Sequence, residues 1–147
     1  MAEDLNQKIE IYKTYVESAQ KISEQRCNIN NVFMTFNIGL IGLQAFVNIF
    51  VLVLFAILTN IIWIVQIKTY KTINKAKFHI INSIEKELPY SPFKDEYDIL
   101  KNQKNYMCTS SELLIPKILI AFYIIGGILY KFKDFFIEIL KEIICSC

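Results

Sequence analysis

The sequence predicts an all-α integral membrane protein, in which a two-span transmembrane helical hairpin extends into a cytoplasmic helical bundle. Three observations lead to this fold class. The chain of 147 residues is 54% hydrophobic, and its mean hydropathy of +0.35 is high for a soluble domain. Residues 32–67 contain no Asp, Glu, Lys, Arg or His over 36 consecutive positions. Lysines flank this uncharged run on both sides.

The uncharged run is too long for a single straight crossing. As one helix it would measure roughly 54 Å, against a hydrocarbon core of about 30 Å. A hairpin of two spans with a turn near residues 44–50 uses the whole run. No Gly or Pro marks that turn, so only Gln44 and Asn48 suggest its position.

The charges on either side of the run indicate its orientation. Basic residues precede it at Lys13, Lys21 and Arg26, and four lysines follow it within residues 68–77. Under the positive-inside rule both ends are cytoplasmic, which requires an even number of crossings. The protein is therefore expected to be multi-pass with a cytoplasmic N-terminus. Acidic residues stand where a signal peptide would be basic, so the first span is expected to serve as an uncleaved anchor.

The segments before and after the hairpin predict cytoplasmic helices. Residues 1–31 carry an apolar seam with a mean period of 3.5, formed by Leu5, Ile9, Tyr12, Val16 and Ala19, which is typical of an amphipathic helix. Residues 68–112 hold eight lysines and six carboxylates. The second span is expected to continue into this region until Pro89, and another helix is expected from Phe93 to Leu100. Together these helices predict a small bundle.

A third apolar helix is predicted over residues 113–130, and it has two interpretations. Pro116 suits a first helical turn and Lys117 can extend to the headgroups, so the helix could span the membrane. The 13 uncharged residues after Lys117 suit a packed or interfacial helix equally well, and this second interpretation is favoured. Residues 131–147 follow the i, i+3, i+4, i+7 rule and predict an amphipathic C-terminal helix.

No constellation of catalytic residues is readable in the sequence. His79 is the only histidine, and the four glycines form no phosphate-binding loop. We therefore expect no enzyme, no metal site and no cofactor. A net charge of +2 does not suggest a nucleic-acid partner.

Polar residues inside the uncharged run are candidates for an oligomer or pore face. Asn37, Gln44 and Asn48 are separated by seven and four residues, so they would share a face if one helix carried them all. Asn60 lies in the second half of the run. Amides within lipid need hydrogen-bond partners. Hydrogen bonding across a helix or subunit interface is favoured here over the lining of a pore.

Five charged residues are expected just outside the apolar segments, where unpaired charges are costly. The candidate network consists of Glu17, Arg26, Lys77, Glu85 and Glu112. We expect Arg26 to pair with Glu85 or Glu112, and Lys77 to pair with Glu17, within or between subunits. The alternative is a solvated face with weak ion pairs of about 0–1 kcal/mol each. If the network holds subunits together, Glu85→Gln should loosen the oligomer in detergent.

Many positions resemble the RipA-like family of small octameric bacterial membrane proteins. The match runs over roughly residues 10–125 as scattered positions in register. It includes Tyr12-Lys13, Val16-Glu17, Arg26, Asn37, Trp63, Tyr70-Lys71, Ala76-Lys77-Phe78, Ile84-Glu85, Leu88-Pro89, Phe93, Glu96-Tyr97 and Ile115-Pro116. The resemblance implies a two-span protein of the bacterial inner membrane, with both termini cytoplasmic and eight copies in a homo-oligomeric ring.

Two function classes follow from these features. The first is a non-enzymatic ring that forms a pore or perturbs the bilayer, as an effector in stress or anti-phage defence, controlled through its cytoplasmic part by a protein or a small-molecule trigger. The alternative is a structural scaffold that docks a cytoplasmic partner or organises lipid without conductance. In both classes the expected partners are other copies of the chain and the lipid bilayer.

Overall fold

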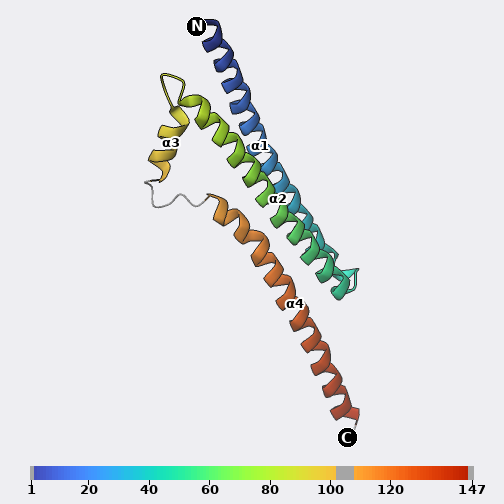
Figure 1. Ribbon diagram of the computed structural model, residues 1–147. Coiled ribbons are helices and arrows are strands. Elements are labelled where there is room, and N and C mark those ends of the chain that lie inside the picture. The colour runs from blue at the N-terminus through green and yellow to red at the C-terminus, as the bar shows by residue number, and fades with distance from the viewer. Residues whose placement is uncertain (1, 102–107, 146–147) are drawn as a thin grey trace. The chain divides into compact units, whose positions relative to one another are not determined.

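The computed structural model describes residues 2–101 and 108–145, and all elements in these ranges are helical (Figure 1). They follow the chain as α1 (Ala2–Gly42), the short 3-10 helix η1 (Leu43–Ala45), α2 (Ile49–Glu85), α3 (Pro92–Lys101) and α4 (Cys108–Cys145). The all-α prediction is confirmed for this part of the chain. The predicted amphipathic helix and the first apolar segment are parts of one continuous helix, α1, because no helix breaker separates them.

The chain divides into two compact units, one of which contains the uncharged residues 33–64. The polar unit comprises Met1–Val32 and Val65–Glu112, and the apolar unit comprises Phe33–Ile64 and Leu113–Cys147. Residues 33–64 carry no charge, whereas the polar unit contains the candidate charge network. Both α1 and α2 contribute one segment to each unit.

In the polar unit, the first part of α1 packs antiparallel to the last part of α2. Tyr12 contacts Glu85, whereas Ser18, further along α1, contacts Lys77, which lies earlier in α2. The residues buried in this interface include Ala19 and Ile81, which lie on the apolar faces of the two helices. The apolar seam predicted on α1 therefore has its partner within the same chain. The segment 102–107, which belongs to the predicted region 68–112, lies outside the described residues.

In the apolar unit, the chain reverses direction between Gly42 and Ile49 without a left-handed residue. The backbone N–H of Phe46 donates to the carbonyl of Leu43 at 3.0 Å. The Asn48 side chain accepts from the N–H of Phe50 at 2.9 Å, which caps the start of α2. A 3-10 turn and an Asn cap thus replace the Gly or Pro that the sequence lacks here.

The core of the apolar unit is small and involves three helices. Leu40 of α1, Leu52 and Ala56 of α2 and Tyr123 of α4 form its buried cluster. The helix α4 runs antiparallel to α2, because Gly127 faces Val53 while Lys131, one turn later, lies over the ring of Phe50. A Cβ at Gly127 would lie 3.3 Å from a methyl group of Val53, so only a glycine allows this approach without a shift of that side chain.

Within residues 2–101 and 108–145, two helices are long and apolar enough to cross a membrane: α2, and the Ser111–Lys133 part of α4. The hairpin predicted from the sequence has different spans: it consists of α2 and the apolar end of α1. Since α1 ends at Gly42, its uncharged part spans residues 27–42, or about 24 Å, and is shorter than a hydrocarbon core of about 30 Å. The two limbs of the hairpin are thus unequal. Pro116 also differs from its expected place, because it is buried inside α4 rather than in the first helical turn.

Candidate functional site

The most densely hydrogen-bonded residue of the polar unit is Glu85, the last residue of α2. It is only 1% exposed. Its Oε1 accepts hydrogen bonds from the hydroxyl of Tyr12 at 2.9 Å and from the backbone N–H of Phe93 at 3.1 Å. Its Oε2 accepts from the backbone N–H of Lys94 at 3.3 Å. One carboxylate therefore joins α1, α2 and α3, and this contact is called the α3 junction here.

The sequence around Pro92 explains why a carboxylate is needed there. The first N–H groups of a helix have no partner within the helix, and the helix dipole favours a negative charge near them. Proline at the first position of α3 has no N–H, so the first two free donors are those of Phe93 and Lys94. Glu85 accepts from both. Glu85 therefore caps α3 from outside the helix, because the turn at residues 86–91 brings the start of α3 next to its carboxylate.

Aromatic packing completes this junction. The ring of Phe93 lies 6.3 Å from the ring of Tyr12 and 5.6 Å, edge to face, from the ring of Phe78. Such pairs add about 0.5–1.5 kcal/mol each beyond the burial of their surface. The first turn of α3 is therefore held by both hydrogen bonds and ring contacts.

Tyr12 should make the polar unit sensitive to alkaline pH. Its burial and its hydrogen bond to Glu85 raise the pKa of Tyr12 from 10.0 to about 12. The fold thus favours the neutral phenol. Its stabilising contribution is complete below pH 10 and is lost as the pH rises towards 12. Melting temperatures of the wild type and Tyr12→Phe, compared over that range, should converge; a constant difference would contradict this role of Tyr12.

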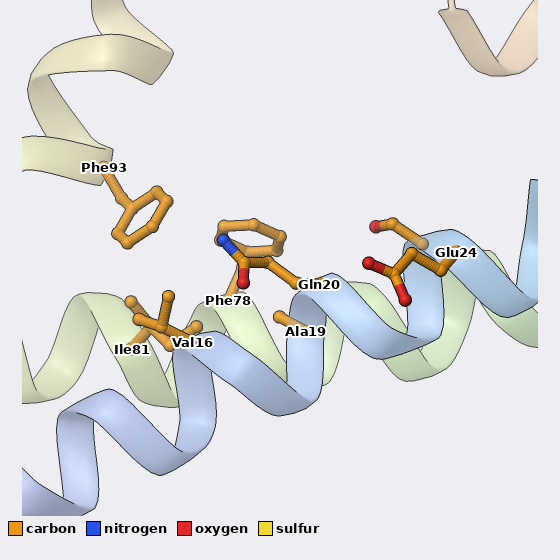
Figure 2. Close-up of a pocket in the computed structure, with 8 residues that line it drawn as sticks. Val16, Ala19, Gln20, Glu24, Phe78, Ile81 and Phe93 are labelled. Atoms are coloured by element: carbon orange, nitrogen blue, oxygen red, sulfur yellow. The ribbon is translucent and has the colours of Figure 1, made fainter.

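A groove of about 460 Å³ lies beside this junction within the polar unit. Figure 2 shows Phe93 of α3 on one side, Phe78 and Ile81 of α2 at its base, and a row of α1 side chains along the opposite wall. That row consists of Val16, Ala19, Gln20, Ser23 and Glu24. The base is apolar and the α1 wall becomes polar towards Glu24. This surface suits an amphipathic ligand or a protein side chain better than a metal ion.

One of the expected pairs of the candidate charge network is present, whereas Lys77 has another partner than the expected one. Arg26 forms a salt bridge with Glu112, one of its two expected partners. Its Nη2 lies 3.4 Å from Oε1 of Glu112, and both side chains are mostly buried. Its other expected partner, Glu85, contacts Tyr12 and α3 instead. Lys77 donates to the hydroxyl of Ser18 and lies 6.0 Å from the ring centre of Tyr15.

The expected partner of Lys77, Glu17, is exposed on α1. The neighbouring Ser18 takes its place, because it lies on the face of α1 that meets α2. Among residues 2–101 and 108–145, no group of three His, Cys, Asp or Glu residues lies close enough to hold a metal ion.

In the apolar unit, Asn37 and Asn60 form a buried pair between α1 and α2. They are 2% and 0% exposed. The side-chain N–H₂ of Asn60 donates to Oδ1 of Asn37 and to the carbonyl of Ala56, each at 2.8 Å. The side-chain N–H₂ of Asn37 donates to the carbonyl of Phe33 at 2.8 Å. The hydroxyl of Tyr123 donates to the backbone carbonyl of Asn37 at 3.2 Å, which ties α4 to this pair.

The three residues expected to share a face if one helix carried them, Asn37, Gln44 and Asn48, do not lie on one helix. Asn37 and Asn60 are enclosed by the helices of one protomer. Gln44 lies in η1 and Asn48 in the following turn, and both are exposed. The expected common stripe required a single helix, whereas α1 ends at Gly42. Gln44 and Asn48 are therefore the two of these residues whose side chains are exposed in the single chain.

Sequence reasoning missed three partners of these sites: Tyr12, Phe93 and Tyr123. Tyr12 belonged to the apolar seam, and its pattern gave no sign that its hydroxyl would contact Glu85. Phe93 was expected only as part of a helix. Tyr123 lies in the middle of an apolar run, where a buried hydroxyl needs a partner; that requirement was the one available signal for a third helix beside Asn37.

Comparison with known proteins bears on the identity of the chain. The model of the Octameric membrane protein family (8xMP) matches residues 9–132. Neither the curated proteins nor the solved structures that were compared contain a match. The family match includes both candidate spans, the Asn37–Asn60 pair and the junction at Glu85, and ends just before the amphipathic tail of α4. Because this match covers most of the chain, the protein belongs to the octameric membrane protein family.

Proposed function

We propose that eight copies of the chain form a ring in the bacterial inner membrane, which opens a pore or perturbs the bilayer as an effector in stress or anti-phage defence. The polar unit lies in the cytoplasm in this proposal, as the flanking lysines favour, and controls the ring. The octameric family supports the number of copies. The defence role is a hypothesis that extends beyond the family name.

One observation carries the membrane and assembly part of the proposal. Within the most apolar window of α2 only 22% of the residues are buried in the chain, and within that of α4 only 11%. Many large side chains of the apolar unit are exposed, including Phe46 at 85% and Ile38 at 67%. Apolar surface of this extent is unfavourable in water. Lipid and neighbouring copies are the natural cover for it.

The arrangement inside the apolar unit favours a conducting path between protomers over a conducting path through a single protomer. The side-chain amide of Asn37, the N–H₂ of Asn60 and the hydroxyl of Tyr123 hydrogen-bond to one another or to nearby carbonyls, whereas no described residue hydrogen-bonds to the buried Oδ1 of Asn60. Hydrogen bonds of this kind hold helices together. A conducting path is then expected along the axis of the ring, where exposed polar residues such as Gln44 could contact water.

The functional proposal is tested by reconstitution and by expression. Purified full-length octamers in liposomes should release an entrapped dye, and expression in bacteria should depolarise the membrane and arrest growth. Octamers whose insertion has been verified by flotation, but which leave liposomes tight and cells healthy, would remove the pore proposal. Empty liposomes and liposomes with a monomeric membrane protein serve as controls.

Charge substitution at Gln44 tests whether the turn lines the pore. We expect Gln44→Glu to favour cations and Gln44→Lys to favour anions, because a ring of like charges at a constriction selects the opposite ion. Reversal potentials in planar bilayers under a salt gradient would shift in opposite directions for the two variants. Identical shifts would place Gln44 away from the conducting path.

The groove of the polar unit favours a second candidate, a scaffold that docks a cytoplasmic partner. An open surface with an apolar base and a polar wall is suited to protein contact. This function predicts one stoichiometric partner in purifications from the native host and no conductance. The loss of that partner on Gln20→Arg, at an exposed position of the groove wall, with an unchanged octamer, would support it.

A further inference from the structure

The last part of α4 extends beyond the other helices of the apolar unit. Lys131 lies over the ring of Phe50, which is the second residue of α2, and α4 continues to Cys145. Residues 132–145, called the tail here, add about 21 Å of helix. Phe132, Phe135 and Ile143 are 60%, 57% and 57% exposed. The tail therefore presents large apolar side chains without cover from α2.

The spacing of apolar residues in the tail is that of a helix that packs on other helices. Phe132, Phe136, Ile139 and Ile143 follow one another at intervals of four, three and four, which is a heptad seam. Phe135 and Leu140 flank this seam on its two sides. In the sequence, Asp134, Glu138 and Lys141 stand at positions of the helical period opposite the seam. An apolar face wider than the seam allows one helix to contact a neighbour on each side.

We propose that the tails of neighbouring copies pack in parallel through this face and form a ring of helices that extends the octamer. The inference rests on the proposed homo-oligomer. Copies in one octamer share an orientation in the membrane, and α4 is continuous from its apolar segment into the tail, so each copy brings its tail next to two others. A helix in a ring has two neighbours, which is what the two flanks of the seam provide.

The sequence disfavours a tail that lies flat on the membrane surface. Such a tail would have to bend away from α4, but no Gly or Pro follows Gly127. Surface-binding helices also carry a basic polar face that attracts anionic lipids. The polar face of the tail instead mixes acidic and basic residues. A second copy is therefore the better occupant of the apolar face.

The tail is an addition to the part of the chain that the family shares, since the family match ends at residue 132. The octamer should thus form without the tail and be stabilised by it. This separates the inference from the functional proposal, which needs the octamer but not the tail contacts.

Two isoleucines of the tail form a matched pair for the test. Ile139 belongs to the seam, and Ile137 lies about 160° away around the helix. In the full-length protein, Ile139→Asn should lower the temperature at which detergent-solubilised octamers dissociate by several degrees, as measured by native mass. Ile137→Asn removes the same apolar surface and helix propensity but should leave that temperature unchanged. Equal effects of the two variants would overturn the proposal.

Cross-linking provides a measurement that does not depend on stability. With the four native cysteines replaced by Ser, Ile143→Cys should give cross-linked dimers with a short bifunctional thiol reagent in membranes, because seam positions of parallel neighbours lie side by side on the inner face of the ring. Ile137→Cys should not. Intact octamers without cross-links at residue 143 would overturn the tail contacts alone and leave the pore proposal standing. Protection of a cysteine at residue 143 from a water-soluble maleimide, with no cross-link, would mean that the tail lies in lipid.

Discussion

Asn60→Asp should prevent the apolar unit from folding, whereas the same substitution at Asn48 should be harmless. The two N–H bonds of Asn60 go to Oδ1 of Asn37 and to the carbonyl of Ala56, which are both acceptors. An aspartate would place a carboxylate oxygen against both, at a position with no exposure. A charge at the centre of a membrane helix costs about 2.5–3.5 kcal/mol on insertion scales, and unpaired burial adds to this.

Asn48 makes a close control for that prediction. It lies in an exposed turn, and its side-chain oxygen accepts from the N–H of Phe50. Aspartate serves as an N-cap as well as asparagine does, so Asn48→Asp should keep the cap. The yield of monodisperse protein and its melting temperature in detergent distinguish the two variants. Equal yields and melting temperatures would show that the Asn37–Asn60 pair does not support the fold.

The second large effect is expected at the junction of α3. Glu85→Gln should release the first turn of α3, because an amide has only one acceptor oxygen for three donors and turns its own N–H₂ towards one of them. An unpaired buried donor costs about 1–3 kcal/mol. Hydrogen exchange at the amides of Phe93 and Lys94 should accelerate. The melting temperature of the polar unit should fall with it.

Glu87→Gln is the matched control for the α3 junction. Glu87 pairs with Lys8 at 2.8 Å, but its side chain is 60% exposed, and exposed pairs contribute about 0–1 kcal/mol. This variant should leave the amide exchange of α3 unchanged. Similar exchange rates in both variants would contradict the role of Glu85 as the cap of α3.

The sequence predicted the helices better than their partners. The continuation of α2 beyond the apolar run and its end before Pro89 follow from local chemistry, since the apolar period persists and proline stops a helix. The turn near residues 44–50 was placed only by the length of the run and by the polar residues Gln44 and Asn48. Because it begins at Gly42, the first limb is shorter than expected, and Asn37 is separated from the exposed Gln44.

Long-range contacts account for the remaining differences. Glu85 could equally have paired with Arg26, and only the folded turn at residues 86–91 brings α3 to its carboxylate. Pro116 suggested a helix start, yet α4 begins at Cys108 and continues through the proline, as membrane helices can when neighbouring groups satisfy the freed backbone carbonyl. One-dimensional spacing identifies which residues need a partner. It does not identify the partner when several lie within reach.

Thiol labelling in intact cells tests most directly whether the chain folds back within the membrane, so that the turn lies across the bilayer from the lysine-rich parts. With the other cysteines replaced by Ser, one protein keeps the exposed Cys27 and a second carries only Phe46→Cys in the turn. A membrane-impermeant maleimide should reach the turn from outside the cell and should reach Cys27 only after the membrane is permeabilised. Labelling of both positions from the same face would contradict the hairpin and the oligomer built on it.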